Sequence, residues 1–181
     1  MSASSPVVED RLSERLKTVQ NNYVLGLASL ALLTSESAQI QLRADSAQFG
    51  GFTVQFLQVA ELMLVPTHRD DAINSFLIML MCSLIKDTFE LTRHHAKRGG
   101  VLAALKTQHW YQFARLVRNC LGHNFILEVN ERDLRMMPVQ WRGRTLTASM
   151  NGSPLPLHLF GYEQAWQLFL DMRQYSLDKG L

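Results

Sequence analysis

Apolar residues recur every three or four positions through most of the first 125 residues, which is the spacing of one buried helix face. The pattern predicts a first helix from Val7 to about Thr34, with Ser5 and Pro6 as its N-cap and first-turn proline. A weaker pattern at Ala38 to Ala47 fits either a short helix or a loop. Beyond a Gly-Gly pair, Phe52 to Leu64 is predicted to be helical again.

A second long helix is predicted from about Thr67 to Lys97, because aspartates occupy its first turn and a Gly-Gly pair follows its basic end. Its apolar block, Phe76 to Ile85, is shorter than the roughly 20 residues that cross a bilayer. We therefore expect the buried central helix of a soluble domain, with no membrane contact. A further helix is predicted from Val101 or Lys106 to Gly122.

The pattern changes in the last third of the chain, where extended segments replace helical spacing. Val139 to Trp141 and Thr145 to Met150 have strand propensity. Asn151-Gly152, followed by Leu155 to Phe160, predicts a β-hairpin with its turn at this pair. Gly161 then precedes a last amphipathic helix.

Together these patterns predict a mainly α fold, with a helical bundle over about residues 5–127 and a β-hairpin and last helix at about 136–177. With 181 residues and no repeat or long linker, the chain is expected to form a single domain. Cys82 and Cys120 give neither a disulfide framework nor a metal-ligand spacing. We therefore expect no metal, no cofactor and a reducing, cytoplasmic location, and the first residues show no signal peptide.

The net charge of +2 hides a strongly basic stretch, because Leu91 to Leu127 contains no acidic residue. This stretch also holds four of the six histidines, and such a local excess of positive charge is typical of a surface that binds a polyanion. An alternative is that the cations pair with acids on the preceding helix. The cations are Arg93, Lys97, Arg98, Lys106, Arg115 and Arg118, and the candidate acids are Asp70, Asp71, Asp87 and Glu90.

The basic stretch contains the run Arg118-Asn119-Cys120-Leu121-Gly122-His123. On a helical wheel Arg115, Asn119 and His123 follow a spacing of four, Arg118 flanks them, and Gly122 leaves the middle of this arc without a side chain. A fixed cation, an amide and an imidazole, the side-chain type that exchanges protons near neutral pH, form a set suited to a phosphodiester. The opposite arc is predicted to face the core, and its residues are Trp110, Phe113, Ala114, Val117, Cys120 and Leu121.

Each polar residue of this helix also has an ordinary structural explanation. Arg118 can be a surface or salt-bridged arginine, and Asn119 with Gly122 can simply end the helix. His123 can be a C-terminal residue favoured by the helix dipole. Tyr111 belongs to an aromatic cluster that fits a core better than a base-stacking platform, although its place on the wheel is towards the polar side.

The stretch from Phe113 to His123 resembles the signature of the HEPN superfamily, the higher eukaryote and prokaryote nucleotide-binding domains. That signature is an arginine followed by a polar residue, most often asparagine, with a histidine a few positions later. Arg118, Asn119 and His123 match it with four residues between the arginine and the histidine. A tryptophan-containing strand pair and a final helix follow, as in some bacterial members, and the resemblance covers about residues 68 to 175.

The resemblance implies a metal-independent endoribonuclease that works as a homodimer, often as a toxin or phage-defence effector that a protein antitoxin restrains. Arg118 would then stabilise the scissile phosphate, Asn119 would orient the phosphate or the imidazole, and His123 would act as general acid or base. RNA supplies its own 2′-hydroxyl as nucleophile, so the protein provides only proton transfer and charge stabilisation. The residues expected to bind RNA around this set are Arg93, Lys97, Tyr111 and Arg115.

One position departs from the family pattern. In the subgroup inactivated by a nucleotidyltransferase antitoxin, a tyrosine two positions after the histidine receives the modification, and here that position is Phe125. Many family members also bind or scaffold without cleaving RNA. A catalytically inactive HEPN-like binding module is therefore the alternative function.

Overall fold

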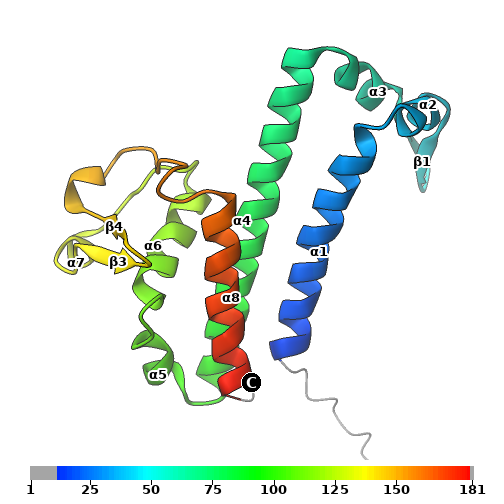
Figure 1. Cartoon of the computed structure of the whole chain (residues 1–181). Helices are drawn as coiled ribbons and strands as arrows, with labels where there is room; N and C mark the ends of the chain where they lie inside the picture. The colour runs from blue at the N-terminus through cyan, green and yellow to red at the C-terminus, as the bar shows by residue number, and fades with distance from the viewer. Residues whose placement is uncertain (1–11, 180–181) are drawn as a thin grey trace, which may run out of the picture. The chain divides into compact units, whose positions relative to one another are not determined.

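Helices make up most of the computed structural model, in which residues 12–179 are described (Figure 1). Within this range eight α-helices, one short 3₁₀ helix and two antiparallel strand pairs occur, so the predicted mainly α fold class is confirmed. The chain divides into two compact units. Residues 21–80 form the small unit, and residues 12–20 together with 81–179 belong to the motif unit, which holds the Arg-Asn-His motif. That the chain folds as a single domain stays a prediction.

The two long predicted helices are both present. α1 spans Leu12–Leu33 and α4 spans Pro66–Arg98. The N-cap predicted at Ser5-Pro6 lies outside the described residues. The Gly-Gly pair ends α4 as the sequence predicts, because Gly100 takes a φ of 69°, the left-handed conformation that commonly stops a helix.

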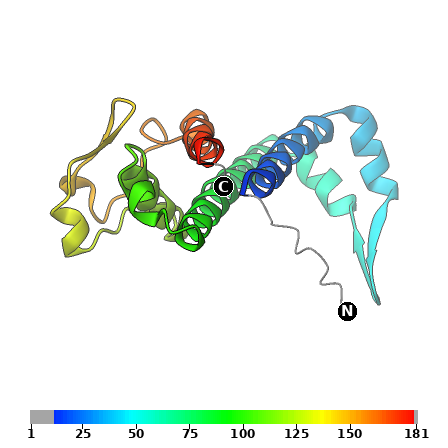
Figure 2. The ribbon, with the colours of Figure 1, turned by 90° about the horizontal axis from the view of Figure 1, so that it is seen from below.

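The small unit differs from the prediction in its middle. After α1 its elements are α2 (Glu36–Ala44), β1 (Ser46–Phe49), β2 (Phe52–Gln55) and α3 (Leu57–Leu64). The predicted helix from Phe52 to Leu64 is therefore wrong for its first residues, which form a strand. The Gly-Gly pair makes a two-residue hairpin turn, in which Gly50 has a φ of 58°, and the aromatic and β-branched residues beside it pair across the turn. Figure 2 shows this hairpin extending away from α2 and α3.

The motif unit continues beyond α4 with short elements. In chain order they are α5 (Leu102–Lys106), α6 (Tyr111–Gly122), α7 (Glu131–Leu134), β3 (Val139–Trp141), β4 (Arg144–Leu146), the 3₁₀ helix η1 (Ala148–Met150) and α8 (Tyr162–Asp178). The helix predicted from Val101 or Lys106 to Gly122 is thus two helices. Side chains explain the break, because the Thr107 hydroxyl donates to the Ala104 carbonyl at 2.9 Å and so satisfies the end of α5. The predicted last helix is confirmed as α8.

A β-hairpin lies in the predicted C-terminal region, but it is not the one predicted around Asn151-Gly152. β3 and β4 pair about Arg142-Gly143, whose φ angles of 45° and 74° are those of a type I′ turn. Asn151-Gly152 is not a hairpin turn, Leu155 to Phe160 is not a strand, and η1 replaces the end of the strand predicted to reach Met150. The Asn151 side chain instead accepts a hydrogen bond from the Val129 N–H at 3.0 Å. This tertiary contact outweighs the local turn signal.

One carboxylate fastens the β3–β4 hairpin to α8. Asp171 accepts hydrogen bonds from the Trp141 indole N–H at 2.8 Å and from Arg142 Nε and Nη2 at 3.1 and 2.7 Å. Burial alone would raise the pKa of Asp171, but the hydrogen bonds from Arg142 and Trp141 and the charge of Arg142 lower it below its usual value. The carboxylate therefore stays charged while it holds the hairpin in place.

The core of the motif unit is aromatic. The ring of Phe113 on α6 lies 5.1 Å from Trp141 and 6.1 Å from Phe160, measured between centroids. All six residues of the apolar arc predicted for this helix are buried, so the predicted core face is confirmed.

The apolar block of α4 is buried only in its second half. Met81, Leu84 and Ile85 are buried, whereas Phe76 is half-buried and Met79 is exposed. The prediction of a central buried helix therefore holds only for the C-terminal half of the block. By length and composition α4 is also the one helix among residues 12–179 that is apolar enough to cross a membrane, a test that core helices of soluble proteins pass as well.

Candidate functional site

Helix α6 carries the motif and lies mostly buried. Gln112, Arg115, Arg118 and Asn119 are half-buried, and every other residue of the helix before Gly122 is buried. The polar side chains therefore form the wall of a recess and not an open helix face.

The chain turns sharply where α6 ends. His123 has a φ of −121° and a ψ of 50°, outside the helical region, and Asn124 and Phe125 take positive φ values of 52° and 64°. His123 therefore does not continue the stripe that the wheel predicts through Arg115 and Asn119. A Cβ placed on Gly122 would meet nothing within 4 Å, so the space predicted beside this glycine is open.

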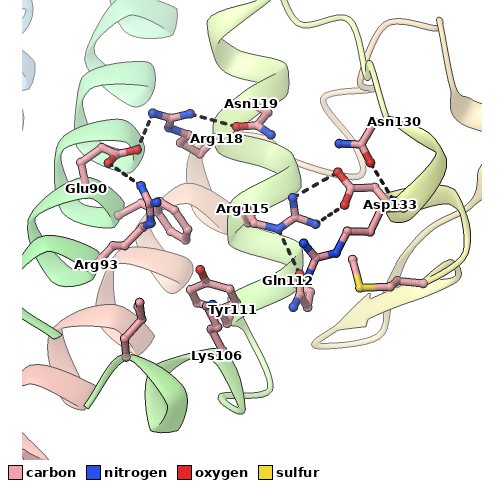
Figure 3. Close-up of a pocket in the computed structure, with 14 residues that line it drawn as sticks. Glu90, Arg93, Lys106, Tyr111, Gln112, Arg115, Arg118, Asn119, Asn130 and Asp133 are labelled. Carbon is pink, nitrogen blue, oxygen red and sulfur yellow. Dashed lines mark hydrogen bonds and ion pairs between the residues drawn. The ribbon is translucent and has the colours of Figure 1, made fainter. Parts of the chain in front are cut away.

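Helices α4, α5 and α6 and residues 130–136 enclose a hollow of about 370 Å³, the basic recess, beside Arg118 and Asn119 (Figure 3). Its charged lining residues are the cations Arg93, Lys106, Arg115, Arg118 and Arg132 and the acids Glu90 and Asp133. Five cations against two acids leave a surplus of positive charge. The polyanion surface predicted from the basic stretch therefore has a concave counterpart.

Arg118 lies between an acid and an amide at the top of this recess. Its Nη2 pairs with Glu90, and its Nη1 donates to the Asn119 side-chain oxygen at 2.9 Å. Glu90 also lies 3.5 Å from Arg93, so one carboxylate is shared by two guanidinium groups (Figure 3). The alternative expectation of pairing with the preceding helix is thus met at Glu90. One negative charge nevertheless leaves the pair of arginines with a net positive charge.

Arg115 makes a different kind of contact deeper in the recess. Its two Nη atoms donate to the two carboxylate oxygens of Asp133 at 3.1 and 2.6 Å, and its Nε donates to Gln112 at 3.0 Å. The Asp133 side chain is only 4% exposed, so this is a buried, bidentate ion pair. Arg115, predicted to bind RNA, is therefore already neutralised, and it holds the turn at Asn130 to Asp133 against α6 (Figure 3).

His123 lies in a second, more open hollow of about 530 Å³, the histidine hollow. Its other lining residues include Asn119, Glu128 and Asn151. His123 Nδ1 lies 3.7 Å from a Glu128 carboxylate oxygen, and both side chains are about 60% exposed. Asn119 lines both hollows, whereas Arg118 lines only the basic recess and His123 only the histidine hollow. Asn130 and Asp133 line both hollows as well, so within one chain the cation and the imidazole are separated by a shared wall to which Asn119 belongs.

Of the three remaining residues predicted to bind RNA, two line the basic recess and one does not. Arg93 lines the basic recess, Lys97 does not, and Tyr111 lines it with a side chain that is 3% exposed and packs on Phe89. A ring so covered has no free face for stacking a base. Lys106 and Arg132 also line the recess, although neither is among the residues predicted to bind RNA. Lys106 could have been predicted as a phosphate contact, because it lies in the acid-free basic stretch. Arg132 could not, because it stands between two acidic residues in the sequence.

Cys120 is buried on the apolar side of α6, as the wheel predicts. Burial raises the pKa of its thiol to about 11, so the thiolate is scarce at neutral pH. A nucleophilic role for this cysteine is therefore disfavoured.

The two hollows offer anion binding in one and proton exchange in the other. Among residues 12–179 no group of three or more His, Cys, Asp or Glu side chains is arranged to hold a metal ion. Comparisons of the chain with protein-family profiles, curated proteins and solved structures found no match. The chemistry assigned to the site therefore rests on its own residues.

Proposed function

We propose that this protein is a metal-independent endoribonuclease of the HEPN type that uses Arg118, Asn119 and His123. The observation that carries the proposal is the basic recess, which adjoins through Asn119 the hollow that contains His123. A concave surface with surplus cations suits a phosphate backbone, because phosphate contacts supply most of the affinity for nucleic acid. The exposed imidazole beside it supplies the proton transfer that RNA cleavage needs.

In this mechanism a phosphate oxygen takes the place of Glu90 at the Arg118 guanidinium. An arginine fork binds phosphate through parallel hydrogen bonds, and the contact with Asn119 keeps the fork oriented. The RNA 2′-hydroxyl attacks the adjacent phosphorus, and the bond to the 5′-oxygen of the next nucleotide breaks. His123 takes the proton from the 2′-hydroxyl or delivers one to the leaving oxygen. The products are a 2′,3′-cyclic phosphate and a 5′-hydroxyl.

The proposal includes a homodimer and a role in defence or stress. Arg118 and His123 line different hollows in one chain, so a substrate must span both or meet His123 of a second chain. A toxin or phage-defence effector restrained by a protein antitoxin fits such an enzyme. Phe125 has no hydroxyl and packs partly buried against the core, which leaves no acceptor for nucleotidyl transfer at that position.

A catalytically inactive binding module is the second candidate. The observation that favours it is that Arg115 and Arg118 already have acidic partners, as structural ion pairs do. Lys106 and Arg132, which make no ion pair with an acid in residues 12–179, would then hold a polyanion without any chemistry.

The test is cleavage of single-stranded RNA by the full chain in excess EDTA. We expect cleavage that leaves 2′,3′-cyclic phosphate ends, and a rate lower by about 100- to 10,000-fold in His123→Ala, because a general acid or base is removed. RNA affinity of this variant should be nearly unchanged. The matched control is His158→Ala, which removes another exposed histidine outside both hollows and should keep the wild-type rate.

Two further variants separate binding from chemistry. Arg118→Ala should lose both turnover and affinity, whereas Lys106→Ala should weaken binding in a salt-dependent way and leave the cleavage step intact. Wild-type turnover by His123→Ala, or activity lost on chelation and restored by a divalent metal, would overturn the mechanism. RNA binding by a wild-type chain that cleaves no RNA tested would favour the binding module.

A further inference from the structure

The small unit holds most of the large apolar side chains that are exposed in the described part of the chain. Fourteen of the eighteen large apolar side chains that are exposed in residues 12–179 lie in it, although it holds only three of the thirty-one buried apolar residues. Monomeric proteins rarely expose large contiguous apolar patches, because burying such surface is the main favourable term in folding. This distribution indicates that a binding partner covers apolar side chains of the small unit.

The β1–β2 hairpin has one apolar and one polar face. The register pairs Ala47 with Val54 and Phe49 with Phe52 on one face of the strands, and it pairs polar residues on the other. Phe52 is 78% exposed, Phe49 63% and Val54 49%, so the apolar face is uncovered. The hairpin is therefore amphipathic, with nothing in the small unit over its apolar face.

The hairpin also lacks the features that protect a sheet edge. It is a two-stranded sheet, so each strand has an unpaired edge, and an isolated hairpin is only marginally stable in water. No charged residue and no proline occurs from Ser46 to Ala60. Edges that natural proteins leave in solvent usually carry such residues to prevent pairing with another chain.

We propose that a second copy of this chain covers this face, so that two small units pack through their hairpins across a two-fold axis. An uncharged apolar face is complementary to itself, as an isologous interface requires. Phe49 and Phe52 expose roughly 250 Å² between them. A stable interface covers about 800 Å² on each partner, so the hairpin would form its centre and other exposed apolar side chains of the unit would extend it.

The charges beside the hairpin disfavour a lipid surface as the occupant. Residues 36–65 contain the acids Glu36, Asp45 and Glu61 and the single cation Arg43. Segments that lie in a bilayer interface usually add Lys and Arg that attract anionic lipids. The same acids would not repel a second copy at the hairpin, because none of them lies between Ser46 and Ala60.

The test compares two neighbouring substitutions on opposite faces of β2. The full chain should be a dimer by light scattering at micromolar concentration, and Phe52→Glu should raise the dissociation constant at least ~100-fold because it buries an unpaired charge. Thr53→Glu, which adds the same charge to the polar face, should remain dimeric. Phe49→Ala provides a second variant with no added charge and should weaken the dimer by ~10-fold or more.

Circular dichroism of each variant should match the wild type, which separates lost association from lost folding. A wild-type chain that is monomeric, or equal dissociation constants for Phe52→Glu and Thr53→Glu, would overturn the proposal. Binding of a monomeric wild-type chain to vesicles of phosphatidylcholine and phosphatidylglycerol, abolished by Phe52→Glu, would overturn it in favour of a lipid surface. The proposal does not rest on ribonuclease activity, because an inactive binding module would dimerise through the same face.

Discussion

The motif unit and the small unit place their apolar side chains in opposite ways. The motif unit encloses an aromatic core around Phe113, Trp141 and Phe160, and even an ion pair, Arg115 with Asp133, is buried in it. The small unit buries Tyr23, Ala60 and Met63 as its apolar residues and leaves both hairpin phenylalanines in solvent. One unit therefore has the interactions to be stable by itself, whereas the other depends on a partner for comparable burial.

This difference affects how each unit responds to protein concentration. Burial within one chain stabilises at any dilution, whereas burial against a second chain stabilises only where the dimer forms. Matched substitutions in the two units can therefore separate the two sources of stability.

The largest difference is expected between Phe160→Ala and Phe52→Ala. Phe160 is fully buried, so truncation should lower the free energy of unfolding by about 3–5 kcal/mol at every protein concentration. Phe52→Ala should lower it only at concentrations where wild type is dimeric. Urea denaturation at two protein concentrations measures both. A loss for Phe52→Ala that does not depend on concentration would show that the small unit buries Phe52 within its own chain.

The next difference concerns two aspartates. Asp133→Ala leaves the half-buried Arg115 guanidinium without its carboxylate, and breaking a buried ion pair costs about 3–5 kcal/mol. Asp45→Ala removes an exposed carboxylate from the small unit and should change the free energy of unfolding by less than about 0.5 kcal/mol. Thermal and urea unfolding of both variants provide the measurement. Equal small effects would mean that Asp133 is far more solvated than its 4% exposure indicates.

Sequence periodicity predicted the long helices and the core face of α6 because those features depend on local spacing. The C-terminal end of α4 is read directly from the Gly-Gly pair, and the apolar arc of the motif helix from the repeat of three and four. The β1–β2 hairpin was missed because the four residues of β2 read equally well as the first turn of the following helix, and only pairing with β1 selects the strand.

The sequence was sufficient to predict the motif residues of the candidate site, but not which contacts these residues make. Arg118, Asn119 and His123 were identified from one short run, and Arg118 does contact Asn119. The neutralisation of Arg115 depends on Asp133, eighteen residues away, and no periodic pattern connects them. His123 leaves the stripe because its own backbone is non-helical, just before the turn at Asn124 and Phe125. Neither of these two residues is a glycine that would signal positive φ.

A smaller, pH-dependent effect is expected at Asp171 in the motif unit. Its pKa is lower in the folded chain than the value of about 3.9 for an unfolded aspartate. Its contribution is therefore complete above the unfolded pKa and is lost as the pH falls through the folded pKa. Asp171→Asn should cost about 1–2 kcal/mol at neutral pH, from weakened hydrogen bonds to Trp141 and Arg142, and should flatten the loss of stability below about pH 4. Urea titrations across this range test it, and an unchanged pH profile would contradict the assignment.

The smallest effect comes from two glycines with positive φ, one in each hairpin turn. Gly50 and Gly143 have φ values of 58° and 74°, and a Cβ on either would meet no atom within 4 Å. Alanine at either position therefore adds backbone strain of about 1 kcal/mol or more and no clash. Gly143→Ala should lower the free energy of unfolding of the motif unit without affecting dimerisation, because it loosens β3 and β4. Gly50→Ala should weaken the dimer by a few-fold and leave unfolding of a diluted, monomeric chain almost unchanged. Sedimentation equilibrium and urea unfolding of both variants distinguish the outcomes, and a reversed pattern would mean that the small unit is the self-sufficient one.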